Sequence, residues 1–195
     1  MTIMKFICGA LICLLALQGE AQSTSSPPRV KKHHIAFYGG VGPNYYFNNL
    51  VIGKQNVNSF NYSFAGRFMW EPGHLLSVGI ESGYYRLYTV TASQPVEAHV
   101  SNSAVPIQLV ISMKFLKSWY ANFNMGQTLL LNKAQETGHD AVNASSWSLA
   151  DFAGSVGYRY RFENRVSVGA ETKFFFSSSY NDMNIALLFM VGYNF

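Results

Sequence analysis

The sequence contains few cysteines and few charged residues. Its two cysteines, Cys8 and Cys13, both lie within the first 21 residues, and charged residues make up 12% of the chain. Soluble domains typically have about 25% charged residues. Beyond residue 21 the chain therefore has no thiols for disulfides or for thiolate metal sites. That part also has no apolar run as long as the ~18 residues that a membrane-spanning helix needs, so a helical membrane protein is excluded.

The N-terminus has the pattern of a secretory signal peptide. Lys5 provides a short positive region, and residues 6–17 form a 12-residue apolar run, too short to cross a bilayer as a helix. Small residues follow in Gly19-Glu20-Ala21, so we expect a signal peptide over 1–21 that is cleaved after Ala21. A short membrane anchor is the alternative. Residues 22–33 are rich in Ser, Pro and Lys and are expected to form a flexible lead-in, followed by one domain over 34–195.

What the chain does contain is a repeated alternation of apolar and polar residues. Phe64, Phe68 and Trp70, for example, alternate with Ala65, Arg67 and Met69. Successive side chains of a strand point to opposite faces, so each alternating segment predicts a β-strand with one apolar face. Eight segments have this pattern, at about 34–47, 58–70, 75–90, 103–116, 119–131, 147–162, 166–177 and 184–195.

Charged residues are distributed unequally between the two strand faces. The apolar face carries one charge, Arg86, between Tyr84 and Tyr88. A cationic side chain facing lipid at the bilayer midplane costs about 2–4 kcal/mol, so we expect the apolar face to contact lipid. A soluble, lipocalin-like barrel with its apolar residues inward is the alternative. The other face carries eight charges: Arg67, Glu81, Lys114, Asp151, Arg159, Arg161, Glu171 and Lys173.

The connections between the segments alternate in length. Short turns at 71–74, 116–118 and 163–165 alternate with longer polar connections at 48–57, 91–102 and 132–146. Short periplasmic turns and long outer loops are typical of outer-membrane barrels. The sequence thus predicts an all-β fold: a closed, eight-stranded, antiparallel up-and-down transmembrane β-barrel in the cell outer membrane. The lead-in and both termini of the barrel are then periplasmic.

The charges on the inner face are expected to form a lumen charge network. Arg67 and Glu81 lie on adjacent predicted strands, and the 163–165 turn makes Arg159 and Glu171 diagonal neighbours. Eight strands leave an interior just wide enough for side chains, which favours a paired polar core over the alternative of a selective ion path. The predicted network consists of Arg67, Glu81, Lys114, Arg159, Arg161, Glu171 and Lys173.

Two groups of loop residues are candidates for catalysis. His99 precedes Ser101 and Ser103, and His139-Asp140 precedes Ser145 and Ser146. A nucleophile needs a base within hydrogen-bond reach and a third group that orients the base. Both sets fall in predicted loops, so no catalytic residue is predicted. The adjacent pair His33-His34 lacks a third ligand, so no metal site and no cofactor are predicted either.

The final segment alternates up to Phe195, with Tyr193 and Phe195 on its apolar face. It resembles the C-terminal signal of bacterial outer-membrane β-barrels, which implies that Tyr193 and Phe195 are read by the barrel-assembly machinery. The whole chain after residue 21 is similar in architecture to the small PorT-like outer-membrane barrels common in Bacteroidetes. That resemblance rests on Glu20-Ala21-Gln22, the opening strand 36–45 and the closing strand. It implies a Gram-negative source and, for a few members, a role in protein secretion or surface assembly.

These features favour a structural or partner-binding role through the surface loops. The alternatives are a lipid-modifying hydrolase or acyltransferase and, less favoured, a narrow pore; the motifs of lipid A deacylases and palmitoyltransferases are not found. Expected partners are outer-membrane lipid, the assembly machinery, and a protein or glycan at the outer loops, with the barrel as a monomer. The net charge of +4 is scattered along the chain and predicts no nucleic-acid partner.

Overall fold

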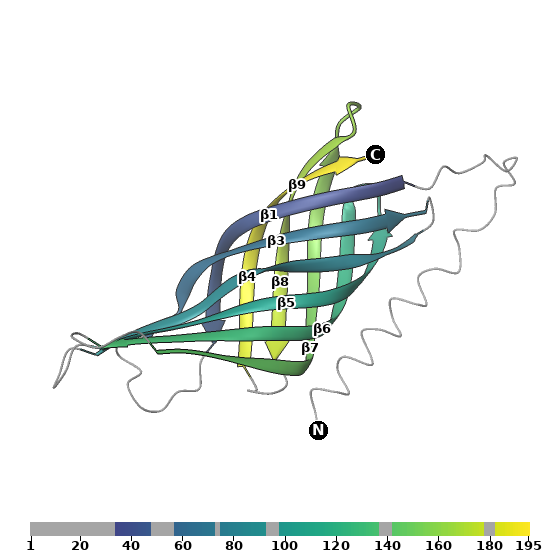
Figure 1. Cartoon of the computed structure of the whole chain (residues 1–195). Coiled ribbons are helices and arrows are strands. Elements are labelled where there is room, and N and C mark those ends of the chain that lie inside the picture. Colours follow the sequence, from purple (N-terminus) through teal and green to yellow (C-terminus); the bar gives the residue numbers. More distant parts are fainter. Residues whose placement is uncertain (1–33, 48–56, 73–74, 93–97, 137–141, 178–181) are drawn as a thin grey trace, which may run out of the picture. The chain divides into compact units, whose positions relative to one another are not determined.

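The computed structural model describes residues 34–47, 57–72, 75–92, 98–136, 142–177 and 182–195. The predicted signal peptide and lead-in lie outside these residues. No helix in the described part of the chain is long and apolar enough to cross a membrane. The described residues form β-strands joined by short connections (Figure 1). The strands are β1 (His34–Phe47), β2 (Val57–Asn58), β3 (Phe60–Glu71), β4 (Leu76–Ala92), β5 (Ala98–Phe115), β6 (Trp119–Glu136), β7 (Val142–Arg161), β8 (Val166–Ser177) and β9 (Asp182–Asn194).

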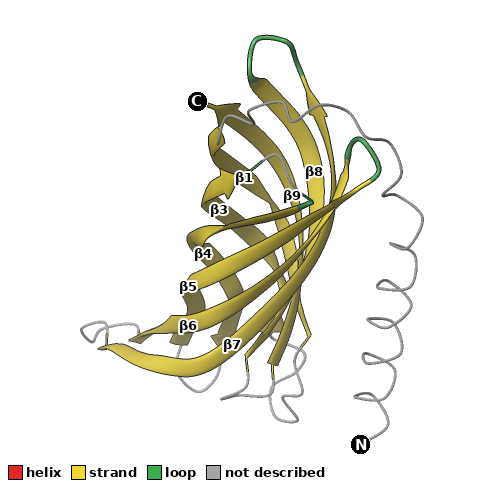
Figure 2. Cartoon of the chain, turned by 90° about the vertical axis from the view of Figure 1, so that its right-hand side faces the viewer, coloured by secondary structure: helices red, strands yellow, loops and turns green. Residues whose placement is uncertain are grey.

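The strands form one closed antiparallel barrel (Figure 2). Sequential neighbours pair along the wall, and β1 pairs with β9 to close it. At this seam the backbone N–H of Phe195 donates to the carbonyl of Ile35 at 2.8 Å. The two-residue strand β2 pairs only with β4 and continues the edge of β3, so the wall has eight long strands. The predicted fold class, an eight-stranded antiparallel barrel, is confirmed.

The two faces of the wall differ as the alternation predicts. Ile80 and Leu109 are paired on adjacent strands and are 61% and 48% exposed, although both are aliphatic. The inward positions are buried and hold both the small apolar core, with Tyr38 and Leu188, and the polar residues of the lumen. A continuous exposed apolar wall around a polar interior is the arrangement required by lipid, and it is opposite to that of a soluble barrel.

Two tight turns mark what we call the short-turn end of the barrel. They follow β5 at residues 116–118 and β7 at residues 162–165. Leu116 and Arg165 adopt positive φ angles of 63° and 68° in these turns, a conformation that L-residues rarely adopt. The opposite end, which carries the connections after β1, β4, β6 and β8, is called the outer end.

The strands at the outer end are longer than predicted. Residues 98–102 belong to β5, 132–136 to β6 and 142–146 to β7, where the sequence predicts loops. Pairing continues through them, from Ala98 opposite Glu136 and from Val142 opposite Ala134. These polar strands resemble loops in sequence because no buried face imposes alternation outside the membrane. Both views show the outer ends of β5, β6 and β7 beside one another (Figures 1 and 2).

Candidate functional site

The middle of the lumen is crossed by a cluster of four charged side chains. The Nε of Arg67 donates to Glu81 at 2.7 Å, and its two terminal nitrogens donate to the two carboxylate oxygens of Glu171 at 3.0 and 2.8 Å. The ammonium of Lys173 donates to Glu81. All four residues are at most 3% exposed, and the two positive charges balance the two negative ones. Buried charges are tolerated when they are paired in this way.

Neutral donors complete the hydrogen bonding of this central cluster. The hydroxyl of Tyr120 donates to Glu171 at 2.9 Å, and the amide of Asn122 donates to it at 3.2 Å. The amide of Asn124 donates to Glu81 at 3.1 Å. The ring of Tyr120 fits against the wall because its neighbour is Gly157, where a Cβ atom would meet the ring. Together these side chains fill the cross-section of the lumen.

A second cluster lies nearer the short-turn end and is built around Glu71. Its carboxylate accepts hydrogen bonds from Lys114 at 2.6 Å, Arg161 at 3.0 Å and Arg159 at 3.3 Å. The Tyr38 hydroxyl donates to it at 2.6 Å. The guanidinium of Arg159 also lies over the Tyr38 ring, 4.3 Å from its centroid. This cluster carries two more positive charges than negative ones.

Glu71 is absent from the predicted network because it precedes Pro72 and Gly73, which predict a turn. The alternation could have identified it, since Glu71 has the same parity as Arg67 in the same strand. The register predicted for Arg159 and Glu171 is confirmed. Their strands pair with Arg159 opposite Gly169 and Gly157 opposite Glu171, so the two residues are diagonal neighbours. Their hydrogen bonds nevertheless lead elsewhere, from Arg159 to Glu71 and from Arg67 to Glu171.

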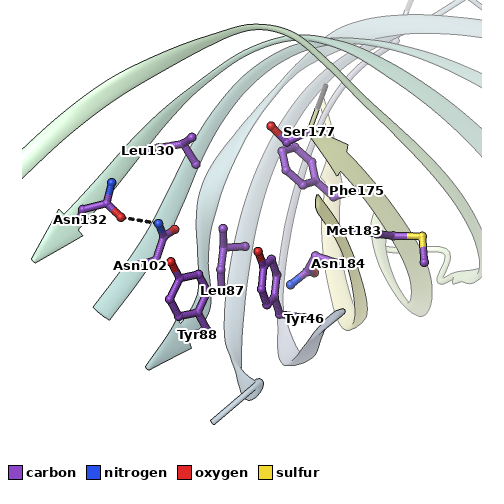
Figure 3. Close-up of a pocket in the computed structure, with 10 residues that line it drawn as sticks. All are labelled: Tyr46, Leu87, Tyr88, Asn102, Leu130, Asn132, Phe175, Ser177, Met183 and Asn184. Atoms are coloured by element: carbon purple, nitrogen blue, oxygen red, sulfur yellow. Dashed lines mark hydrogen bonds between the residues drawn. The ribbon is translucent and has the colours of Figure 1, made fainter. Parts of the chain in front are cut away.

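The half of the lumen toward the outer end contains a cavity of about 210 Å³ (Figure 3). Three aromatic rings and three amide side chains line it, together with aliphatic and hydroxyl groups, and none of the described residues that line it is charged. We refer to it as the outer cavity. It is lined by Tyr46, Leu87, Tyr88, Asn102, Leu130, Asn132, Phe175, Ser177, Met183 and Asn184.

A β-bulge brings Tyr88 into this cavity. Strict alternation predicts Tyr88 on the lipid face together with Tyr84, and for Tyr88 that prediction is wrong. The register between β4 and β5 shifts between Arg86 and Tyr88, so that Tyr88 pairs with Asn102 and lines the cavity. An extra residue in one strand reverses the parity of the residues after it, and nothing in the local sequence signals it.

The candidate catalytic residues do not form a constellation in the described part of the chain. His99 lies on β5, where its Nδ1 is 3.3 Å from the hydroxyl of Thr91 on β4. Ser103 instead shares a hydrogen bond with the hydroxyl of Tyr84 at 2.7 Å. His33, His139 and Asp140 lie outside the described residues. Among those described, no group of three or more His, Cys, Asp or Glu side chains could hold a metal ion.

Tyr193 and Phe195, the predicted assembly signal, lie on the outward face at the short-turn end. Their side chains are 43% and 62% exposed, and their rings pack edge to face with centroids 5.2 Å apart. Asn194 between them points inward and donates through its amide to the carbonyl of Arg165 at 3.1 Å. The hydrogen bond of Asn194 thus holds the end of β9 in place, with the two aromatic rings on the outer surface of the wall.

Comparisons with known proteins relate the chain to others through its structure. No family model and no curated protein matches the sequence. Ail, the attachment invasion locus protein of Yersinia pestis, solved with the heparin analogue sucrose octasulfate, is similar with a TM-score of 0.56 and 9% identity; the match covers 84% of this chain and 99% of Ail. A second structure of Ail has a TM-score of 0.52 at the same identity and coverage. Neisserial surface protein A has a TM-score of 0.45 and 11% identity over 83% of this chain and 97% of its own.

The fold is that of an outer-membrane β-barrel. The likeness to Ail covers most of this chain, and the identity of 9% limits it to the fold. The exposed apolar wall is independent of that likeness and requires a lipid environment. The protein is accordingly a small barrel of the cell outer membrane.

Proposed function

We propose that this protein is a non-enzymatic outer-membrane barrel that binds an extracellular partner with the sheet at its outer end. This projecting sheet consists of residues 98–103 of β5, 131–136 of β6 and 142–148 of β7. A transmembrane strand needs about 9–11 residues, whereas β5, β6 and β7 have 18, 18 and 20. The surplus continues as paired strand, and this is the observation that carries the proposal.

Continuous pairing makes the projecting sheet a firm platform. Lys133 lies opposite both Ser101 and Asn143, so β6 is paired on both of its edges at this position. Its polar side chains are free to meet a partner: Lys133, Gln135, Asn143 and Ser145 are all exposed. Binding residues are commonly presented on segments that a rigid scaffold positions, and a paired sheet loses less conformational entropy on binding than a loose loop does.

The proposed partner is a protein or a glycan. Ail, whose fold is similar, is named for attachment and was solved with a heparin analogue. That fact concerns Ail, and it motivates including glycans in the test. The projecting sheet contains one lysine and one glutamate, Lys133 and Glu136, so these formal charges cancel, which favours polar over strongly anionic partners.

Two other functions are less well supported. An acyl-transfer enzyme needs a base close to a nucleophile, and His99 bonds to Thr91 on the neighbouring strand. Unchanged lipid profiles in His99→Ala and His139→Ala variants would count against such an enzyme. A pore needs an open lumen, and Arg67 and Glu171 meet across its middle with little exposure. Planar-bilayer recordings of the purified barrel are therefore expected to lack conductance.

The decisive experiment shortens the projecting sheet and leaves the barrel intact. Asn132 and Ala144 are cross-strand partners, so replacing residues 133–143 by Asn-Gly joins them with a two-residue hairpin turn and removes Lys133, Gln135 and Asn143. Intact and shortened barrels are compared in pull-downs from outer membranes and on glycan arrays, with correct folding checked by heat-dependent gel mobility. A partner retained by the intact barrel alone supports the proposal. Identical binding by both barrels contradicts it.

We also propose roles for the two ends of the chain. Residues 1–21 would direct export, 22–33 would lie in the periplasm, and Tyr193 with Phe195 would engage the assembly machinery, as in the PorT-like barrels that the sequence resembles. Deleting Phe195 is expected to lower the amount of barrel in the outer membrane, measured by fractionation. Exchanging Phe195 for Trp, which keeps an aromatic ring, serves as the control.

A further inference from the structure

The outer cavity has features of a binding site distinct from the exposed side chains of the projecting sheet, although Asn102 and Asn132 belong to both regions. It lies inside the lumen, toward the outer end, and six different strands contribute to it. Tyr88, Asn102 and Asn132 line it while keeping partial exposure, so a solute can reach its wall. Its volume of about 210 Å³ corresponds to roughly seven water molecules at about 30 Å³ each. That is below the ~300–1,000 Å³ of pockets for drug-sized ligands, so the cavity suits a single small ring.

The amide of Asn184 is the strongest sign that the cavity takes a ligand. The side chain is 1% exposed, yet neither its nitrogen nor its oxygen has a hydrogen-bond partner among the described residues. In Figure 3 the amide lies beside the ring of Tyr46 at the cavity wall. A buried polar group without a partner costs about 1–3 kcal/mol. A ligand with both donors and acceptors would remove that cost.

A second amide pair adds to this unused capacity. The amide nitrogen of Asn102 donates to the oxygen of Asn132, which aligns the two side chains across β5 and β6 (Figure 3). The oxygen of Asn102 has no partner among the described residues. Among the described residues, the oxygens of Asn102 and Asn184 and the NH₂ of Asn184 therefore have unused hydrogen-bonding capacity in the wall of the cavity. Hydroxyl groups, which donate and accept at the same atom, match such a set.

Aromatic rings form the apolar part of the wall. The rings of Tyr46 and Tyr88 lie 5.1 Å apart between centroids and are tilted by 36°. The ring of Phe175 stacks on that of Tyr85 at 6.1 Å, which fixes its position. Ring faces present a flat apolar surface, on which the C–H face of a sugar ring can lie while its hydroxyls reach the amides. The described lining residues carry no charge, which disfavours sulfated or carboxylated rings, because these would be buried without a counter-charge.

We propose that the outer cavity binds one neutral sugar ring. The ligand could come from two sources with the same chemistry, a free monosaccharide or the terminal residue of a surface glycan. This inference goes beyond the proposed partner binding, because the cavity residues differ from those of the projecting sheet that the shortening removes. Each of the two proposals can thus fail while the other stands.

The test measures sugar binding by the full barrel in nanodiscs, which avoids detergents with sugar headgroups. Saturation-transfer difference NMR is recorded with neutral hexoses, with a neutral oligosaccharide, and with glucuronic acid and a sulfated sugar as anionic comparisons. Neutral hexoses are expected to give signals and anionic ones none. Stronger binding of the oligosaccharide than of the monosaccharide identifies a glycan end as the ligand, and equal binding identifies the free sugar.

Three variants tie the signal to the cavity. Asn184→Leu is expected to weaken binding about tenfold or more while the barrel stays folded, because it removes the free donor and acceptor. Phe175→Leu should weaken binding severalfold, whereas Phe174→Leu, the same change at the neighbouring lipid-facing residue, should leave it unchanged. The proposal is overturned if no neutral sugar binds, if only anionic sugars bind, or if Asn184→Leu binds as well as the parent barrel.

Discussion

The two halves of the lumen differ in how the carboxylates of one and the amide of Asn184 in the other are hydrogen-bonded. In the half that holds the two charged clusters, every carboxylate oxygen of Glu71, Glu81 and Glu171 accepts at least one hydrogen bond. In the outer half, the amide of Asn184 accepts and donates none among the described residues. The first half holds the paired charges, and Lys114, Arg159 and Arg161 line a cavity at its short-turn end. The second half contains the outer cavity, whose described lining residues are uncharged.

This difference separates what stabilises the barrel from what it offers to a ligand. Removing one partner from a buried ion pair is strongly destabilising, so the charged half tolerates little change. The outer half carries an unpaired buried amide, which lowers stability and leaves hydrogen bonds available. Functional sites are often regions where local stability has been given up.

The largest effect is expected from Glu171→Gln in the charged half. The substitution keeps the shape of the side chain but leaves Arg67 and Lys173 with one buried carboxylate, that of Glu81. A broken buried pair costs about 3–5 kcal/mol, so the free energy of unfolding in urea, measured in lipid vesicles, should fall by that amount. The double variant Arg67→Met with Glu171→Leu removes one charge of each sign and leaves Glu81 paired with Lys173. It should therefore recover part of the loss. Unchanged stability of Glu171→Gln would remove the distinction between the halves.

A smaller loss is expected from Glu71→Gln. Its three cationic partners lose their common acceptor, but the side chains of Lys114 and Arg161 are 30% and 46% exposed and can be hydrated. Solvent screening weakens such interactions, so we expect a loss of about 1–2 kcal/mol, between the values for exposed and buried pairs. The same urea titration measures it. A loss larger than that of Glu171→Gln would mean that the short-turn end, rather than the middle of the lumen, anchors the barrel.

In the outer half, a substitution should raise the stability of the barrel instead of lowering it. Asn184→Leu replaces an unpaired buried amide with an apolar group of similar shape, so the barrel should become more stable by about 1 kcal/mol. The expected combination is higher urea resistance with lost sugar binding. Asn122→Leu is the matched control in the charged half, where the amide donates to Ser155 and Glu171, and it should destabilise the barrel. Destabilisation by both variants would show that the amide of Asn184 is satisfied in solution.

The smallest effect is expected at the turn that joins β5 to β6. Leu116 is 78% exposed and has a φ of 63°. A left-handed conformation costs an L-residue about 1–2 kcal/mol, and the greater flexibility of glycine in the unfolded chain offsets about 0.5–1 kcal/mol of the relief. Leu116→Gly should therefore raise the free energy of unfolding by roughly 0.5 kcal/mol. Leu75→Gly, at another exposed position of the same end, lacks the positive φ and should not stabilise the barrel.

The strand pattern was predictable because lipid imposes it. β1 and β8 occupy the predicted segments 34–47 and 166–177, where alternate residues such as Phe37 and Phe174 face the bilayer and a shift of one residue would turn them inward. That requirement ends outside the membrane. There the polar residues of β5, β6 and β7 look like loop residues, although their backbones pair.

Partners across the lumen were not predictable from strand order. Glu171 bonds to Arg67, which lies 104 positions away and on a strand that is not adjacent to its own. Such a contact depends on side-chain length and on the width of the closed barrel, which local sequence does not encode. The bulge at Arg86–Tyr88 was also not predictable from the local sequence, because its effect on Tyr88 is visible only in the pairing of β4 with β5.

The seam between β1 and β9 has a consequence for biogenesis. The first and last strands of the ring are neighbours, and the amide of Phe195 bonds to Ile35. The ring cannot close while any strand is still missing, so an incomplete chain exposes two unpaired edges and a wide apolar surface to water. Pairing of segments so distant in sequence is also slow. On the proposed route of export, an unclosed chain is therefore expected to aggregate unless it is protected, and the time to ring closure sets how long that protection has to last.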